Sequence, residues 1–298
     1  MVATSGTIAL RLPFRLPLWP DNLFGHLAAT AVPGIEEWRG GAYRRTLRLP
    51  HGHAIAALRP EPSSVDCLLT LTDVRDLDTA VARCRWLLDL DADPVAIDGV
   101  LSEDEVLAPL VARAPGRRVP GTVDGSELAL RTVLGQQVST AAARTHAGRL
   151  VTLLGDEIVD PAGGLTHLWP TPDAVAAMDP TKLAMPATRR RSLLCLAGAL
   201  ATGDVDLDPG ADWERARSAL MALPGIGPWT VETVAMRALG DPDAFLPTDL
   251  GVRVLAAAIG LPTGAGLVER SRRWTPWRAY AVQHLWATGD HAVNRMPA

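Results

Sequence analysis

From about residue 100 to its end, the chain shows one helical segment after another, and this run constrains the fold more than any other feature. In each segment apolar residues recur at helical spacing, and the breaks fall at Gly and Pro, where helices stop. The segments span residues 126–155, 171–178, 188–203, 213–223, 230–240, 249–261 and 277–288. We therefore expect an all-helical body over residues 101–298.

The chain up to about residue 75 instead holds short β-rich runs separated by Pro, Gly and polar residues. These runs, which predict antiparallel strands, lie at residues 7–12, 43–49, 54–60 and 67–72. Two further stretches are predicted as helices: residues 24–32, after Asp21 and Asn22 as candidate caps, and residues 76–90. The predicted fold class is α+β, with a small antiparallel sheet and helices over residues 1–100.

The composition is that of an ordinary globular protein, with 48% apolar and 21% charged residues among 298. No run approaches the ~18 apolar residues of a membrane span, and the start lacks a secretory signal, so we expect a cytoplasmic protein. Cys67, Cys84 and Cys195 are scattered, without a CxxC or a histidine pair. They predict reduced core thiols rather than a zinc site or an iron–sulfur cluster.

The formal net charge of −4 argues by itself against a nucleic-acid-binding protein. The acidic residues concentrate in stretches such as 89–104, however, while arginines gather elsewhere along the chain. The gathered arginines are Arg117, Arg118, Arg189, Arg190, Arg191, Arg270, Arg272 and Arg273. A single basic face would be sufficient for DNA binding, and these arginines are its candidates.

The most specific local signal is LPGIGPWT, from Leu223 to Thr230, between two helical segments. Gly225 and Gly227 would permit a tight turn with positive φ and leave their amides uncovered. Backbone N–H groups and the start of the next helix could then face a phosphate without basic side chains. A Gly-rich connection without a ligand is the alternative, but the whole pattern favours contact with DNA.

Asp249 follows Pro247 and Thr248 at the start of an amphipathic helix. An Asp there can simply be an N-cap, which stabilises a helix by ~1 kcal/mol, although Thr248 could cap equally well. A helix N-terminus also favours the ionised carboxylate. Such a group can stabilise a positively charged sugar and orient or deprotonate a water molecule, as the carboxylates of sugar-cleaving enzymes do.

Three separated motifs, LPGIGPWT, FLPTDLGVRVL and WTPWRAYAVQHLW, together resemble the helix–hairpin–helix (HhH-GPD) DNA glycosylase superfamily. Within it the chain is similar to 3-methyladenine DNA glycosylase II, the AlkA type, over nearly its whole length. The resemblance implies an N-terminal domain over residues 1–100 and a helical glycosylase domain over residues 101–298, with the active-site cleft between two helical subdomains.

The resemblance implies Asp249 as the catalytic aspartate and Trp229 and Trp286 as pocket tryptophans, although Trp286 can also be interpreted as a core residue. Relatives that also cut the DNA strand carry a lysine at the Trp229 position, whereas the one lysine of this chain is Lys182. A monofunctional mechanism is therefore expected. His26 aligns with a further pocket position, but a lone histidine is more often structural.

Thr233 and Ala287 stand where aromatic pocket residues are expected, so the range of damaged bases is open. Gln137, in LGQQVS, aligns with the residue that fills the space left by an extracted base, where the best-known relatives carry an apolar side chain; an exposed helix-end residue is the alternative. For DNA contact the resemblance implies Gly225, Gly227 and Thr230 besides Gln137. For a monovalent cation held by main-chain carbonyls at the hairpin it implies Met221, Leu223 and Ile226. No cofactor is expected to be required.

The implied function is hydrolysis of the N-glycosidic bond of alkylated bases such as 3-methyladenine and 7-methylguanine. The base would be flipped out of duplex DNA and an abasic site left, as in base excision repair. The expected partner is double-stranded DNA with alkylated bases, and we expect a monomer without membrane contact. The chain also resembles the glycosylase half of bacterial proteins in which an Ada-type alkyltransferase unit comes first, with residues 1–6 as a candidate linker.

Two rival functions are carried forward. A non-catalytic DNA-binding protein could keep the hairpin, although an Asp249 beside two pocket tryptophans argues against it. An enzyme for oxidised or mismatched bases usually has a C-terminal four-cysteine cluster or the hairpin lysine, and the sequence has neither.

Overall fold

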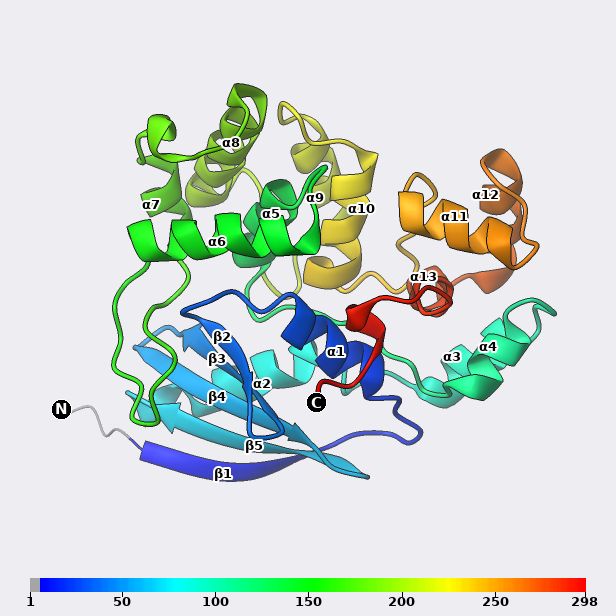
Figure 1. Ribbon diagram of the computed structural model, residues 1–298, viewed down its shortest axis with the longest axis horizontal. Coiled ribbons are helices and arrows are strands. Elements are labelled where there is room, and N and C mark those ends of the chain that lie inside the picture. The colour runs from blue at the N-terminus through cyan, green and yellow to red at the C-terminus, as the bar shows by residue number, and fades with distance from the viewer. Residues whose placement is uncertain (1–5) are drawn as a thin grey trace.

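The computed structural model describes residues 6–298, so most of the candidate linker lies outside the described residues. The α+β prediction is confirmed: a five-stranded antiparallel sheet lies beside a body of helices (Figure 1). The strand order is β1-β5-β4-β3-β2. The strands are β1 (Gly6–Pro13), β2 (Glu36–Arg39), β3 (Ala42–Arg48), β4 (His53–Pro60) and β5 (Ser64–Leu71).

The predicted strands correspond to β1, β3, β4 and β5, and their alternating patterns explain why. In β5, for example, Val65, Cys67, Leu69 and Leu71 are buried and alternate with more exposed residues. The helices α1 (Asp21–Ala29) and α2 (Leu77–Leu87) contribute to the same hydrophobic core as the sheet. Strand β2 was not predicted, because its four residues, EEWR, are too few and too charged to show a strand pattern.

The helical body has a second, separate core. Its helices are α3 (Pro94–Leu101), α4 (Ala108–Arg113), α5 (Gly125–Leu134), α6 (Thr140–Leu154), α7 (Pro172–Ala176), α8 (Ala187–Thr202), α9 (Trp213–Met221), α10 (Pro228–Val234), α11 (Leu250–Ala258), α12 (Ala265–Ser271) and α13 (Arg278–Trp286). A π-helical turn, Ala235–Leu239, continues α10. Short 3₁₀ helices lie at Val74–Asp76, Pro180–Lys182, Arg272–Trp274 and Ala292–Asn294. The predicted division after residue 100 falls near the end of α3 and stays a proposal.

The single helix predicted over residues 126–155 is wrong. The chain instead forms α5 and α6, separated by a turn in which Gln137 has a φ of 56°. This left-handed conformation is uncommon for a residue other than glycine and cannot occur inside a helix. Ser139 then caps α6 by accepting a hydrogen bond from the Ala142 amide. Helical spacing continues across the turn, so the apolar pattern alone did not reveal it.

The C-terminal segment packs back onto α1 near the middle of the molecule (Figure 1). Gly25 makes this approach possible, since a Cβ there would lie within 2.9 Å of the Val293 carbonyl oxygen and closer still to that of Arg295. The short helix Ala292–Asn294 near the C-terminus is thereby held against α1.

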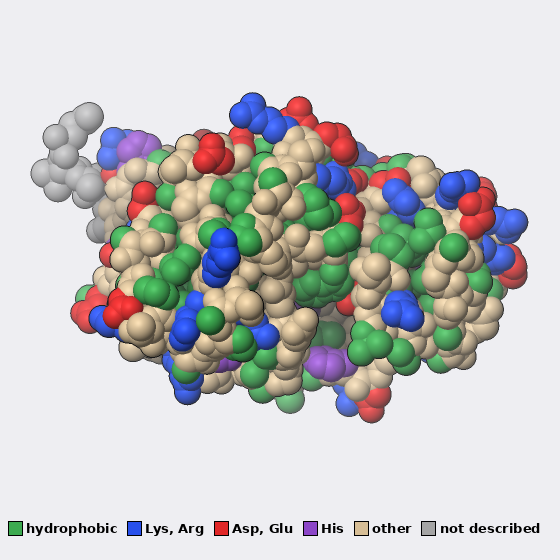
Figure 2. All heavy atoms as spheres, turned by 90° about the horizontal axis from the view of Figure 1, so that it is seen from above, with side chains coloured by type: hydrophobic (Ala, Val, Ile, Leu, Met, Phe, Trp, Pro, Cys, Tyr) green, Lys and Arg blue, Asp and Glu red, His purple; other side chains and the backbone are tan. Residues whose placement is uncertain are grey.

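The expected basic face is wrong for half of its candidate arginines. Arg117 and Arg118 are buried, with relative exposures of 6% and 0%. Arg270 is paired with Asp104 and Glu105, and Arg272 is paired with Glu269. On the face seen in Figure 2, arginines and acidic side chains are interspersed. Residues that are neighbours in the sequence thus do not form one patch in space.

Two other expectations concern metals and membranes. Cys67 and Cys84 are buried free thiols and Cys195 is half-buried, and residues 6–298 contain no group of three His, Cys, Asp or Glu side chains that could hold a metal ion. Over the same residues, no helix is both long and apolar enough to cross a membrane.

Candidate active site

A cavity of about 660 Å³ lies where α1, the α5–α6 turn, α10, α11, α13 and the C-terminal segment meet. This volume lies in the range of small-molecule sites, roughly 300–1,000 Å³. Figure 2 shows the surface hollowed near the middle of one face. Five of the predicted site residues line the cavity together: His26, Trp229, Thr233, Asp249 and Trp286.

Asp249 is both the N-cap of α11 and a cavity residue. Its Oδ1 accepts hydrogen bonds from the Val252 amide (2.8 Å) and from Nε1 of Trp286 (3.0 Å). Its Oδ2 accepts one from Nε1 of Trp229 (2.9 Å). A carboxylate that only accepts hydrogen bonds, and accepts three, is held in one orientation with its negative charge stabilised. Capping and catalysis are therefore compatible functions of one side chain, and Thr248 is exposed and does not cap the helix.

The two tryptophans approach this carboxylate from different helices. Trp229 lies at the second residue of α10, and Trp286 is the last residue of α13. Both are half-buried, and both line the cavity while also packing against the helical core. Gly251 leaves space for them, since a Cβ at this position would lie 3.1 Å from Oδ1 of Asp249 and 3.3 Å from Nε1 of Trp286.

Thr233 lies one helical turn beyond Trp229, and its hydroxyl donates a hydrogen bond to the Trp229 carbonyl oxygen (2.7 Å). His26 reaches the cavity from α1. Burial, and then the nearby charges of Arg237 and Arg131, hold the pKa of His26 well below its ordinary value. His26 therefore offers the cavity a neutral imidazole at neutral pH.

The hairpin between α9 and α10 agrees with its prediction at one glycine and not at the other. Gly225 has a φ of 76°, and a Cβ there would clash with Oγ of Ser192. Both the backbone conformation and the lack of space therefore require glycine at this position. Gly227 is the N-cap of α10 with a φ of −110°, so the positive φ expected for it is wrong. No atom lies within 4 Å of where its Cβ would be, so the space on the Cβ side of this residue is open.

Gln136, which the sequence did not single out, joins this hairpin to the α5–α6 turn. Its Nε2 donates hydrogen bonds to the Gly225 carbonyl oxygen (3.2 Å) and to Oγ1 of Thr230 (3.0 Å). The Thr230 side chain is accordingly buried, at 2% exposure, so that any contact of Thr230 with DNA would come from its main chain. Gln137 is exposed beside this link.

The three residues expected at a cation site differ in their surroundings. Met221 ends α9 with an exposed side chain, while Ile226 is buried. The Leu223 carbonyl oxygen accepts a hydrogen bond from the Ile226 amide (3.2 Å). A carbonyl oxygen has a second lone pair, so this bond leaves it free to take a further partner.

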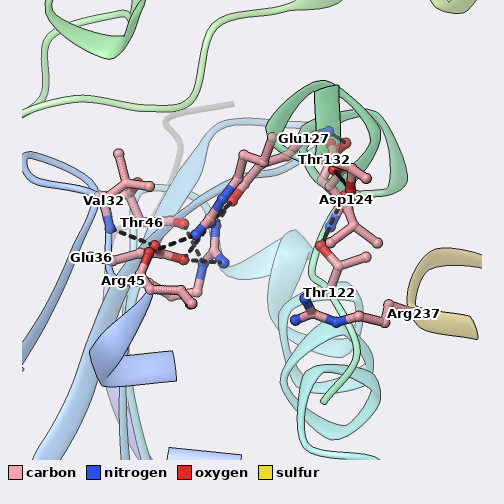
Figure 3. A network of polar contacts seen from close by, with 12 residues as sticks. Val32, Glu36, Arg45, Thr46, Thr122, Asp124, Glu127, Thr132 and Arg237 are labelled. Carbon is pink, nitrogen blue, oxygen red and sulfur yellow. Dashed lines mark hydrogen bonds and ion pairs between the residues drawn. The ribbon is translucent and has the colours of Figure 1, made fainter. Parts of the chain in front are cut away.

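A largely buried cluster of four charged residues lies beside the cavity, and three of them, Glu36, Arg45 and Arg131, line it. Figure 3 shows Glu36, Arg45 and Glu127 of this cluster. Glu36 and Arg45 come from strands β2 and β3, and Glu127 and Arg131 from α5. Arg45 bonds to Glu36 (3.1 Å) and Glu127 (2.7 Å), and Arg131 bonds to the same two carboxylates (2.9 and 2.7 Å). The cluster therefore ties the sheet to the helix that leads into the Gln137 turn.

The charges inside this cluster hold each other ionised. Burial alone would raise the pKa of Glu36, but the charges of Arg131 and Arg45, with hydrogen bonds from Arg131 and Tyr43, outweigh it and lower the pKa to about 2. One weak signal for this cluster was present in the sequence, namely the two arginines at 44 and 45 inside a predicted strand.

Comparison with known proteins places this site in a family. The family model of the AlkA N-terminal domain matches residues 9–124. The chain is 32% identical to the DNA-3-methyladenine glycosylase 2 of Escherichia coli, over 89% of this chain and 92% of that protein. The chain belongs to the AlkA family of DNA-3-methyladenine glycosylases.

A second relative of the AlkA-family chain is longer. It is the probable bifunctional transcriptional activator/DNA repair enzyme AlkA of Mycobacterium tuberculosis, 56% identical over 99% of this chain. The chain spans 60% of the length of that relative. The fold is shared with a 3-methyladenine DNA-glycosylase structure from Archaeoglobus fulgidus, with a TM-score of 0.81 at 20% identity, over 93% of this chain and 97% of that one.

Proposed function

We propose that the chain is a monofunctional DNA glycosylase that releases alkylated bases, such as 3-methyladenine and 7-methylguanine, from duplex DNA. The observation that carries this proposal is the Asp249 carboxylate, fixed by two indole N–H groups and a helix N-terminus at the wall of a cavity large enough for a base. The names of the E. coli and M. tuberculosis relatives agree with it.

The chemistry follows from the charge of Asp249. The bond between C1′ and the base nitrogen breaks with its electron pair going to the base, so that a cationic alkylated base leaves uncharged and the positive charge passes to the sugar. Asp249 stabilises that charge. A water molecule then bonds to C1′ and loses a proton, with Asp249 as the acceptor. The faces of Trp229 and Trp286, whose N–H groups are engaged by Asp249, are free to stack on the cationic base, an interaction worth ~0.5–2 kcal/mol.

Among residues 6–298, no amine is in place for strand cleavage. Lys182, the one lysine in the sequence, is exposed and does not line the cavity. Schiff-base chemistry would need an amine at the sugar, where Trp229 stands. We therefore propose that water is the nucleophile.

The first test is release by the unaltered protein. We expect it to free 7-methylguanine from methylated duplex DNA and to leave an intact strand with an abasic site. Chromatography of the released base, together with denaturing gels before and after alkali treatment, measures both. Strands cut before alkali treatment would contradict the monofunctional mechanism, and a lack of any released base would contradict the whole proposal.

We further propose that Gln137 fills the space left by the extracted base. Its side chain is exposed at the tip of the α5–α6 turn, and Gln136 fixes that turn to the hairpin. A glutamine can also hydrogen-bond to the base left without its partner. The amide of Gly227, the N-cap of α10, and the hairpin around Gly225 would hold the DNA backbone nearby. A monovalent cation on the carbonyls of Met221, Leu223 and Ile226 would support phosphate contact only.

Gln137→Gly separates this function from stability. Glycine accepts the φ of 56° without strain, so we expect stability to be unchanged or raised, by up to about 1 kcal/mol. Single-turnover base release should fall roughly tenfold. Extracting a base costs a few kcal/mol, and in this variant no side chain at position 137 fills the space that the base leaves. Gln137→Leu should retain most of the release, as an apolar side chain also fills the gap. Full release by Gln137→Gly would show that Gln137 is only a turn residue.

The remaining proposals concern the protein as a whole. We propose that the protein is a monomer, which agrees with a site built entirely within one chain. We also propose that it acts in the cytoplasm, on double-stranded DNA. Fusion to an Ada-type alkyltransferase unit agrees with the greater length of the M. tuberculosis relative.

A further inference from the structure

Arg237 brings a positive charge to the cavity without a carboxylate beside it. Its Nε donates a hydrogen bond to the Pro120 carbonyl oxygen (2.7 Å) and its Nη2 to that of Gly121 (3.5 Å). Within residues 6–298, Nη1 has no hydrogen-bond partner and no acidic side chain lies within ion-pair distance of Arg237. Because both acceptors are uncharged, the charge of this guanidinium is not neutralised. Arg237 is half-buried, and a charge partly removed from water is costly unless it is paired, so its placement needs a reason.

The neighbouring acids do not provide the missing partner. Glu36 and Glu127 are fully engaged by Arg45 and Arg131, and these four residues are neutral as a group. Figure 3 shows Arg237 on a different helix, reaching toward Thr122 and apart from that cluster. Burial, and then the charge of Arg131, lower the pKa of Arg237 to about 10, so it stays protonated at neutral pH.

Arg237 and Asp249 lie at different places along the cavity. Trp229, Thr233 and Arg237 are spaced four residues apart on the α10 helix and its π-helical continuation, and all three line the cavity. Eight residues correspond to roughly 12 Å along a helix axis. Trp229 holds the Asp249 carboxylate, so the negative charge lies near one end of this line and the positive charge of Arg237 near the other. A π-helical turn of this kind is often found at functional sites.

We infer that Arg237 is the leaving-group residue: its charge faces the flipped base and drives positive charge from the base onto the sugar beside Asp249 as the glycosidic bond breaks. The inference rests on the proposed function. The electron pair of the broken bond goes to the base, which becomes uncharged, and the sugar becomes cationic until water adds and gives up a proton. Repulsion from Arg237 therefore decreases along the reaction, while attraction to Asp249 increases.

This arrangement accelerates the bond-breaking step because it acts more strongly on the bound substrate than on the transition state. Coulomb repulsion between unit charges halves when their separation grows from about 4 to about 8 Å. With an effective dielectric constant of about 20, this relief corresponds to a rate factor of roughly ten to thirty. The cost is weaker binding of the cationic base, so loss of Arg237 should change kcat and KM in the same direction.

The test uses the whole chain, with single-turnover kinetics on duplex DNA containing one 7-methylguanine. For Arg237→Gln, which is neutral but can still donate a hydrogen bond to Pro120, we expect kcat to fall roughly tenfold or more and KM to fall as well. Arg237→Met, the second neutral variant, should give the same result. Thermal unfolding shows whether each variant is folded, so that one can replace the other. Arg237→Lys keeps the charge and should retain kcat within about threefold.

Arg117→Gln is the matched control. Among residues 6–298 Arg117 is likewise an arginine without an ion pair and is more deeply buried than Arg237, but it does not line the cavity. Its substitution should change stability alone, with kcat and KM unaltered.

Three results would overturn the inference. They are an unchanged kcat in the neutral variants, a loss of kcat in Arg237→Lys equal to theirs, or a rise in KM as kcat falls, since removal of ground-state strain lowers KM together with kcat. Base release by the unaltered protein together with any of these results leaves the proposed function standing. Lack of release by the unaltered protein contradicts both.

Discussion

Asp249→Asn is expected to reduce base release by about a thousandfold and to leave the fold and DNA binding intact. The carboxylate opposes the charge that develops on the sugar, and two unit charges about 4 Å apart attract by about 4 kcal/mol at an effective dielectric constant of about 20. Asparagine removes this charge but remains a good N-cap, so its Oδ1 can still accept the Val252 amide. Single-turnover release of 7-methylguanine measures the effect, and fluorescence anisotropy with a labelled duplex measures binding.

Asp212→Asn is the matched control for this prediction. Asp212 caps α9 by accepting the amides of Glu214 and Arg215, and it lies outside the cavity. The same substitution in the same capping role should leave release within about twofold. If Asp249→Asn still releases bases, Asp249 is a cap and nothing more. If the unaltered protein binds the duplex and releases nothing, the non-catalytic alternative is correct.

The sequence was sufficient to single out Asp249, the proposed catalytic carboxylate, because its signals are local. The hairpin, the Asp249 motif and the tryptophan-rich helix each lie within a dozen or so residues, and each has its own turn or capping chemistry. Their meeting in space could only be inferred from the resemblance. The structure adds how they meet: Trp229 and Trp286 bind the carboxylate through their N–H groups.

Other parts of the site depend on pairings across long distances in the chain. Arg45 and Glu127 are 82 residues apart, and Glu36 and Arg131 are 95 apart. No periodicity or turn signal connects such residues, so the cluster could not be predicted. Arg237 was overlooked for a related reason. A single arginine in a helical segment is usually solvated, and the half-buried position of Arg237 without an ion pair among residues 6–298 becomes evident only in three dimensions.

Short turns were the other source of error. Gln136 and Gln137 are identical neighbours in the sequence, yet the first binds the hairpin and the second is exposed with a φ of 56°. Arg117 and Arg118 were expected at the surface because arginines usually are, and both are buried. In each case tertiary contacts overrode what composition favours.

Glu36→Gln is expected to destabilise the protein by about 3–5 kcal/mol, the usual cost of removing one partner from a buried ion pair. Glu36 accepts hydrogen bonds from Tyr43, Arg45 and Arg131 and from the Val32 amide. Its loss leaves two buried guanidinium groups with one carboxylate between them. Equilibrium unfolding in urea at pH 7 measures the difference. Glu37→Gln is the control: Glu37 is partly exposed, and its partner Arg44 keeps both oxygens of Asp160, so the cost should stay below about 1.5 kcal/mol.

The acid dependence of this difference gives a second, independent check. The pKa of Glu36 is lowered from 4.5 to about 2 on folding. Its contribution is therefore fully present above pH 4.5 and is lost as the pH falls toward 2, because the unfolded chain takes up the proton first. The unaltered protein should lose stability over that range faster than Glu36→Gln, and the gap between them should narrow. A gap that is constant from pH 7 to pH 3, or smaller than about 1 kcal/mol at pH 7, would show that the cluster is held together by shape and packing rather than by charge.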